Sequence, residues 1–132
     1  MRSFPLEIVT PDGLVYDSMV ESLLVSTDDG DVEFLAGHID YMASLAVGRA
    51  RIKVDGENML ASISGGFVTF VKGEARLVAI TFEFADAIDV KRAEAAAERA
   101  KELISSAKDS SAEQVAVAKL KRALNRINVA NM

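Results

Sequence analysis

The sequence predicts an α+β protein in which an N-terminal antiparallel β-sandwich precedes a C-terminal antiparallel two-helix hairpin. Three observations support this prediction. All eight glycines and both prolines lie at or before Gly73, where they separate short β-rich segments. Beyond Phe84 the apolar residues recur at the three- to four-residue spacing of a helix. That second part has one polar break, at residues 105–111, which divides it into two helices.

Short strands fill the first part of the chain. Residues 4–10 and 14–26 are predicted as two strands joined by a turn at Pro11-Asp12-Gly13. Asp55-Gly56 lies between two apolar segments, and Asp-Gly supplies the positive φ angles of a two-residue hairpin. Many short strands with no helix between them favour an antiparallel sandwich over a parallel sheet.

The first predicted helix begins after Asp89, whose short carboxylate can accept from free amides in the first turn and opposes the helix dipole. Its opposite face is charged, so the helix is amphipathic with a narrow apolar stripe. The stripe consists of Ala93, Ala96, Ala97, Ala100, Leu103, Ile104 and Ala107. Alanines bury little area, at about 0.8 kcal/mol for each methyl, so we expect this helix to be weakly docked.

The second helix is predicted to start at the capping-box spacing Ser111-Ala-Glu-Gln114 and to end near Asn128. Two helices with a short connection pack as an antiparallel hairpin. We therefore place the β-sandwich at residues 1–84 and the helical hairpin at residues 85–132. The expected stripe of the second helix is Ala116, Leu120, Ala123, Leu124 and Ile127.

Charge and composition exclude several classes of function. Residues 1–84 carry 6 basic and 13 acidic side chains, whereas residues 85–132 carry 9 basic and 7 acidic ones. The acidic first part argues against nucleic-acid binding, which needs clustered positive charge. The chain has no cysteine, so disulfides and zinc-thiolate sites are excluded. No apolar run reaches the roughly 18 residues of a membrane span, so we expect a soluble protein, or one that is held at a membrane only by other proteins.

Catalytic and metal chemistry have weak support. His38 is the only histidine, and no serine has a local general base beside it. A lone histidine next to a glycine is more often a loop or interface residue, although a small hydrolase using His38 is an alternative. The acidic residues between Asp28 and Glu33 lack EF-hand spacing and favour a solvated loop. We predict no metal, no cofactor and no enzymatic activity.

Four arginines in the second part are the strongest candidates for ligand binding. Arg92 and Arg99 fall on nearly the same line of the first helix, and Arg122 and Arg126 are one turn apart on the second. Planar guanidinium groups suit phosphate oxygens. In a hairpin the two pairs can converge on one polyanion, and the alternative is that they are solvated surface residues.

Five short motifs follow one another along the chain: Val9-Thr-Pro-Asp-Gly13, Leu35-Ala-Gly-His38, Ser64-Gly-Gly-Phe67, Ile88-Asp-Val-Lys-Arg-Ala93 and Leu120-Lys-Arg-Ala-Leu-Asn-Arg126. In this order and spacing they resemble the epsilon subunit of bacterial F-type ATP synthase over essentially the whole chain. The chain departs from the family pattern at Ala36, at Val32-Glu33-Phe34 and at Phe82 and Phe84.

The resemblance implies a non-catalytic rotor subunit, peripheral to the cytoplasmic face of the bacterial cell membrane. Its sandwich would bind the gamma subunit and the c-ring. Its hairpin would extend into the catalytic alpha/beta head and inhibit ATP hydrolysis, or fold down and release the enzyme. ATP binding to the hairpin would favour the folded state. The alternative is the same subunit with a hairpin that contacts only protein partners and does not sense ATP.

The resemblance also implies roles for individual residues. His38 corresponds to a position near gamma, and Asp31 to an acidic position that approaches the loops of the c-ring. Eight residues correspond to the ATP-binding positions of some bacterial members of the family. They are Glu83, Ile88, Asp89, Arg92, Ala93, Arg99, Arg122 and Arg126.

Overall fold

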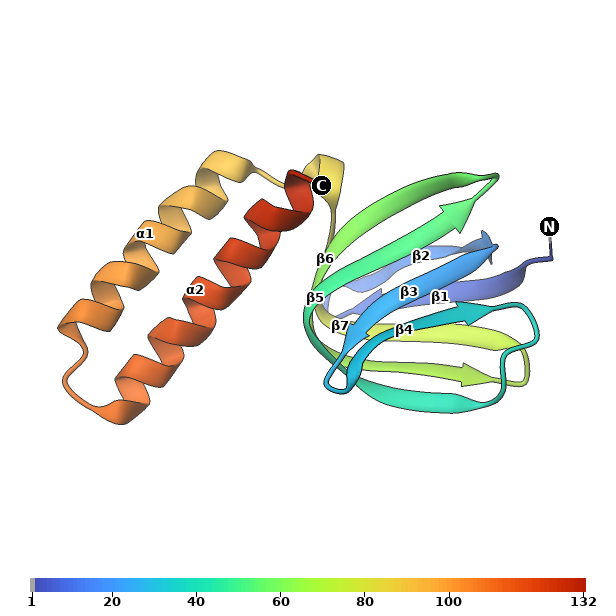
Figure 1. Cartoon of the computed structure of the whole chain (residues 1–132), viewed down its shortest axis with the longest axis horizontal. Helices are drawn as coiled ribbons and strands as arrows, with labels where there is room; N and C mark the ends of the chain where they lie inside the picture. The colour runs from blue at the N-terminus through green and yellow to red at the C-terminus, as the bar shows by residue number, and fades with distance from the viewer. Residues whose placement is uncertain (1) are drawn as a thin grey trace. The chain divides into compact units, whose positions relative to one another are not determined.

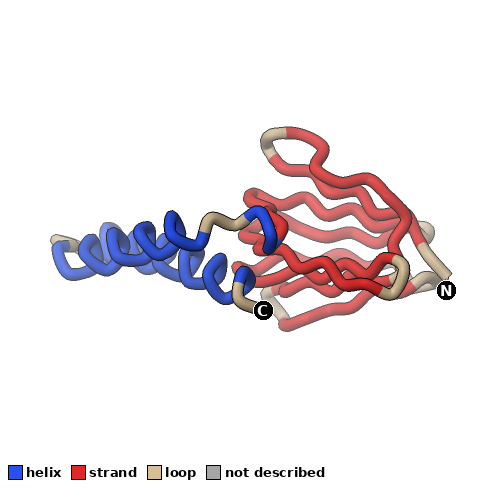
Figure 2. Tube along the Cα trace, turned by 90° about the horizontal axis from the view of Figure 1, so that it is seen from above, coloured by secondary structure: helices blue, strands red, loops and turns tan. Residues whose placement is uncertain are grey.

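The computed structural model describes residues 2–132, and these divide into two compact units, one ending at Phe84 and one running from Ala85 to Met132. The first unit is all β and the second is helical (Figure 2). This agrees with the predicted fold class of a β-sandwich followed by a two-helix hairpin. Each unit is described below by itself.

Seven strands form the first unit, in the sheet order β2-β1-β7-β6-β5-β3-β4. The long strands β5 and β6 curve strongly, so that the sheet folds over into two layers (Figure 1). Neighbouring strands are antiparallel except for β1 and β7, which pair in parallel. The strands are β1 Phe4–Thr10, β2 Gly13–Val20, β3 Ser22–Thr27, β4 Gly30–Leu35, β5 Tyr41–Val54, β6 Glu57–Val71 and β7 Glu74–Phe84.

Large apolar side chains fill the space between the two layers. Along β1, the alternate residues Phe4, Leu6 and Ile8 are buried, as expected for a strand with one face in the core. Phe34 and Phe70 stack in this core with ring centroids 5.6 Å apart. Because so many leucine, isoleucine and phenylalanine side chains are fully buried, the sandwich has a core of its own.

Glycines lie at turns between strands, as predicted. Asp55 and Gly56 both have positive φ, at 53° and 79°, and join β5 to β6 in the predicted two-residue hairpin. At Gly66 the backbone lies against the carbonyl oxygen of Val78, where a Cβ atom would collide. The glycine is therefore required for the close approach of β6 and β7.

One predicted strand is in fact two. Residues 14–26 are interrupted at Glu21, because β2 pairs with β1 whereas β3 pairs with β4 and β5. The backbone amide of Glu21 donates to the carbonyl of Lys53 at 2.8 Å, so the chain passes from one layer to the other without a loop. The sequence shows no glycine or proline at this point, which is why the break was missed.

The second unit comprises η1 (Ala85–Ala87), α1 (Val90–Ser106) and α2 (Ser110–Ala130). Asp89 caps α1 as predicted, with its Oδ1 accepting from the amide of Arg92 at 3.1 Å. The predicted cap of α2 was wrong. Asp109 caps that helix, accepting from the amide of Ala112 at 2.7 Å, so α2 begins one residue before Ser111. A carboxylate at this position also opposes the helix dipole, which a serine does not.

The two helices contact each other through alanines. Leu103 and Leu124, which the predicted stripes included, are exposed, and Val129 near the end of α2 is buried instead. Among the described helices, none is long and apolar enough to cross a membrane. The buried alanines of the hairpin are Ala93, Ala97, Ala100, Ala116 and Ala123.

Candidate functional site

Three of the four candidate arginines directly precede a buried alanine. Arg92 precedes Ala93 and Arg99 precedes Ala100 on α1, and Arg122 precedes Ala123 on α2. One residue corresponds to about 100° of rotation, so each guanidinium stem leaves its helix on the flank beside the alanine face. All three arginines are exposed, as expected for side chains at the edge of a helix contact.

The two helices place these arginines on one side of the hairpin. The two helices of an antiparallel pair are related by an approximate two-fold axis perpendicular to the plane that contains both. Side chains that are rotated by the same angle, in the same sense, from the contact face of each helix therefore lie on the same side of this plane. Arg92 and Arg99 therefore share a flank with Arg122. Arg126 comes three residues after Ala123, which is about 60° from it in the same rotational sense. All four arginines thus lie on a single side, here called the arginine flank.

The level of each arginine along the hairpin follows from its distance to the helix connection. Arg92 lies 14 residues before the end of α1, and Arg122 and Arg126 lie 12 and 16 residues after the start of α2. Arg92 is therefore level with the midpoint between Arg122 and Arg126, within about 3 Å of each at 1.5 Å per residue. Arg99 is about two turns nearer the connection. Arg92, Arg122 and Arg126 therefore lie at the end of the hairpin that is far from the helix connection. Arg99 continues the arginine flank toward the connection.

The start of α1 completes this end of the hairpin. Asp89 is exposed and forms the helix cap, Ile88 is 9% exposed, and Ala93 is fully buried. The start of α1 thus exposes Asp89 and Arg92, whereas the aliphatic side chains of Ile88 and Ala93 are buried. The charge of the flank is purely cationic apart from Asp89, whose Oδ1 is already engaged with the helix backbone. Such a surface can receive an anion with several oxygen atoms.

Glu83, the remaining candidate of the ATP-binding set, belongs to the sandwich unit. It is half-buried near the end of β7 and pairs with Ser62 of β6. Glu83 already has an interaction partner.

The two candidate partner-interface residues lie in different parts of the sandwich. His38 is packed between the rings of Phe34, Phe70 and Tyr41, and its Nδ1 is 2.7 Å from the carbonyl oxygen of Ile39. Its ring therefore fixes the loop between β4 and β5 to the aromatic core. Asp31 is exposed on β4 at the edge of the sheet, where Arg49 binds it at 3.3 Å.

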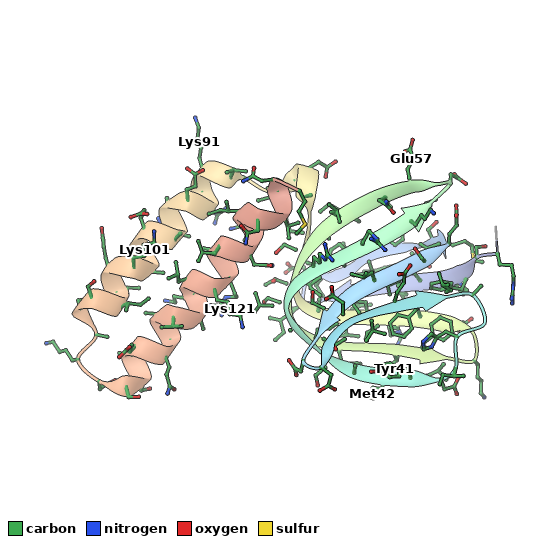
Figure 3. All side chains as sticks on the ribbon, in the orientation of Figure 1. Tyr41, Met42, Glu57, Lys91, Lys101 and Lys121 are labelled. Carbon is green, nitrogen blue, oxygen red and sulfur yellow. The ribbon has the colours of Figure 1, made fainter. Side chains whose placement is uncertain are left out.

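An apolar surface on the outer face of the sandwich was missed by the sequence reasoning. The cross-strand register places Ser44, Phe67, Val78 and Val9 side by side on β5, β6, β7 and β1. Exposed large apolar side chains extend this row, and Figure 3 shows Met42 at the start of β5. The outer apolar surface is defined by Met42, Phe67, Val78, Ile80, Val9 and Leu14. Apart from Val78 and Ile80, which share β7, its members come from different strands, so only the strand pairing reveals the surface.

Among residues 2–132, no group of three or more histidine or carboxylate side chains is placed to hold a metal ion. The imidazole of His38 is held by a backbone carbonyl at Nδ1 and by contacts with three aromatic rings. The arrangement described so far can bind anions and protein surfaces.

Two models of one protein family together match residues 3–131. Residues 3–85 match the model described as ATP synthase, Delta/Epsilon chain, beta-sandwich domain. Residues 86–131 match the model described as ATP synthase, Delta/Epsilon chain, long alpha-helix domain.

Relatives and solved structures agree with this match. The ATP synthase epsilon chains of Bacillus pumilus and Bacillus subtilis are 40% and 42% identical to this chain, each alignment covering 98% of both sequences. A chain of the Euglena gracilis mitochondrial ATP synthase has the same fold, with a TM-score of 0.84 at 21% identity over 98% of this chain and 82% of that one. The chain therefore belongs to the delta/epsilon family of ATP synthase subunits, as a structural and regulatory component rather than a catalytic one.

Proposed function

We propose that this chain is a rotor subunit whose sandwich joins the gamma subunit to the c-ring and whose hairpin responds to ATP. The similar structure from Tetrahymena thermophila is of a central stalk with its c-ring, with a TM-score of 0.60 at 13% identity over 98% of this chain and 95% of that one. Through this complex the subunit is held peripherally at the cytoplasmic face of the bacterial cell membrane. Proton transport and ATP synthesis belong to the assembled enzyme.

The outer apolar surface supports a protein partner for the sandwich. Ile80 is 63% exposed and Met42 is 67% exposed, and neither side chain belongs to the buried core of the sandwich. A contiguous apolar surface on a folded domain typically marks a protein interface. We assign gamma to this surface and to the loop that His38 holds, and the c-ring to the acidic edge at Asp31.

Co-purification of gamma with this chain tests the assignment. A charge in a desolvated apolar contact is costly, so Phe67→Glu should abolish co-purification of gamma. The control is Glu57→Lys, a charge change at the exposed start of β6, away from this surface (Figure 3). Equal retention of gamma by both variants would place its contact elsewhere.

The arginine flank carries the ATP proposal. The phosphates of ATP bear several negative charges, and guanidinium groups at Arg92, Arg122 and Arg126 converge at one level of the hairpin, with Arg99 beyond them. Asp89 at the start of α1 supplies a polar contact for the rest of the nucleotide, and the buried Ile88 and Ala93 shape the backbone beside it. Glu83 is a further residue of the proposed site. ATP is an effector here and not a substrate.

Binding at this flank would act as a latch. ATP bridges α1 and α2, so it stabilises the folded hairpin over any state in which the helices separate. A ligand at 100 times its dissociation constant contributes about 2.7 kcal/mol to the state that binds it. Without ATP the hairpin extends toward the catalytic alpha/beta head and inhibits hydrolysis. Because alanine contacts are weak, a contribution of this size can decide between the two states.

The alternative is the same subunit with a hairpin that contacts only protein partners and does not bind ATP. Val117 and Leu124 are exposed one heptad apart on α2, and Lys121 lies beside them. An apolar and basic helix face suits an acidic protein surface. In that case the arginines would serve protein partners only.

Calorimetry on the isolated chain separates the two readings. We expect ATP to release heat on binding the wild-type chain and to bind at least tenfold more weakly to Arg92→Gln and to Arg126→Gln. Lys91→Gln is the control, because Lys91 points away from α2 (Figure 3). Absence of any heat or thermal shift at millimolar ATP would remove the effector function and leave the protein-only reading.

A further inference from the structure

A row of polar residues crosses the sandwich from Asp31 to Glu83, with Arg49 in the middle. Asp31 on β4 pairs with Ser26 on β3, and the hydroxyl of Ser26 accepts from the amide of Arg49 at 3.1 Å. On the other side, Arg49 on β5 pairs directly with Ser62 on β6, which pairs directly with Glu83 on β7. Directly opposed residues share a face of the sheet, so Arg49, Ser62 and Glu83 point the same way.

Arg49 is equally placed between the two carboxylates. Asp31 and Glu83 each lie two strands from it, which is about 9.5 Å between Cα atoms at the usual strand spacing. The arginine already spans this distance on one side, since its Nη2 is 3.3 Å from Oδ2 of Asp31. The same side chain can reach Glu83 on the other side. A guanidinium has five donors, and a carboxylate accepts several bonds, so the existing partners of Glu83 do not prevent this.

The neighbouring arginine on β5, Arg51, does not have a carboxylate within reach on both sides. Arg51 binds Glu33 on β4 at 3.6 Å, as Arg49 binds Asp31. On the other side, however, Arg51 pairs with Leu60, which lies beyond the last pair between β6 and β7, at Ala61 and Phe84. Arg51 therefore has one carboxylate within reach along its row, and Arg49 has two.

We propose that Arg49 is a shared cation that links Glu83 to Asp31. When Glu83 is engaged elsewhere or loses its charge, Arg49 binds Asp31 more fully and neutralises the charge that β4 presents at its edge. When Glu83 is available, Arg49 divides between the two and Asp31 is more exposed as an anion. Arg49 is a positioning residue, because it acts on Asp31 and not on a partner directly.

Combined with the proposed function, this link connects the nucleotide to the rotor. ATP that draws Glu83 into its site would strengthen the pair between Arg49 and Asp31, and so weaken the attraction of Asp31 for cationic groups of the c-ring. This consequence rests on the proposed roles of Glu83 and Asp31. The link within the sandwich does not, and it is measurable without ATP.

The test is carbon-detected NMR of the side-chain carboxylates in the labelled full chain, without ATP, at physiological ionic strength. Asp31 and Glu83 are four strands apart, about 19 Å, which exceeds the Debye length of about 8 Å. A direct effect of one charge on the other is thus screened. We expect Glu83→Gln to shift the Asp31 carboxyl resonance and to leave that of Glu33 in place.

Two backgrounds make the result specific. The response of Asp31 to Glu83→Gln should disappear in Arg49→Gln and persist in Arg51→Gln, with the backbone amide spectrum confirming that every variant is folded. An unmoved Asp31 resonance, or equal shifts of Asp31 and Glu33, would overturn the link. ATP is then added to the wild type: a shift of Asp31 extends the link to the nucleotide. If the backbone amide resonances of α1 and α2 do not shift when ATP is added, the effector function is contradicted. The link between Glu83 and Asp31 through Arg49 is still decided by the measurements without ATP.

Discussion

The sandwich and the hairpin are held together by side chains of very different size. The sandwich buries leucine, isoleucine and phenylalanine completely, and each contributes about 1.5–3 kcal/mol to its stability. The hairpin contact consists mainly of alanine methyls, at about 0.8 kcal/mol each. One unit is therefore built to keep its shape, whereas the other can change state for the binding energy of a small ligand. The difference supports the proposal of a fixed coupling domain and a movable regulatory one.

The largest expected effect is in the core of the sandwich. Leu77→Ala removes a fully buried side chain and should cost about 2–5 kcal/mol of unfolding free energy. Both tyrosines lie in the sandwich and the chain has no tryptophan, so tyrosine fluorescence in urea reports this unit alone. Truncation after Ala87 should leave that fluorescence transition unchanged. A lower midpoint in the truncated chain would show that the sandwich depends on the hairpin.

Ala97→Gly is the corresponding change in the hairpin contact. Loss of one methyl and the helix propensity of glycine should cost about 1–2 kcal/mol. Far-ultraviolet circular dichroism at the helix band would report it, while the tyrosine transition of the sandwich stays in place. Should both signals shift together, the two units would unfold as one and the comparison would fail.

The helix caps offer a smaller and more specific test. Asp89→Ala and Asp109→Ala each remove one carboxylate that accepts from a helix amide, at 3.1 Å and 2.7 Å, and each should cost about 0.5–2 kcal/mol of helix stability. Only Asp89 belongs to the proposed ATP site. The thermal shift produced by ATP should therefore fall in Asp89→Ala and remain in Asp109→Ala. Equal losses would mean that ATP responds to helix stability alone.

Surface ion pairs should have the smallest effect, and it should be similar in the two units. Arg76 binds Glu7 at 2.8 Å in the sandwich, and Lys101 binds Glu98 at 3.2 Å in the hairpin. Three of the four side chains are well exposed to water, and Glu7 is half-buried. Neutralising Glu7 or Glu98 to glutamine should change the unfolding free energy by less than about 1 kcal/mol. A much larger loss in either unit would show that ion pairs, and not core size, distinguish them.

Local chemistry made much of this structure predictable from the sequence. Asp55-Gly56 and Asp89 act on residues within one turn of themselves, so their roles are visible in a short window. Leu103 and Leu124 fit the helical spacing and yet are exposed, because alanines bring the helix axes close and leave no room for a leucine at the edge. The parallel pairing of β1 with β7 and the outer apolar surface depend on strand register between distant segments. No spacing within one segment contains that information.

The arginine flank was likewise predictable within each helix but not between the two helices. The sequence placed Arg92 with Arg99 and Arg122 with Arg126, because each pair shares one helix. That the two pairs lie on the same side follows from their common position beside buried alanines. The burial of Ala93, Ala100 and Ala123 was therefore the missing information.

A distance measurement between the two units tests the central claim, that ATP latches a movable hairpin. The chain has no cysteine, so Glu57→Cys on the sandwich and Asn128→Cys near Arg126 give two unique spin-label sites, both exposed. With saturating ATP we predict one narrow distance distribution, which broadens and lengthens when ATP is removed. An identical distribution in both conditions, in a sample where calorimetry shows ATP bound, would contradict the account.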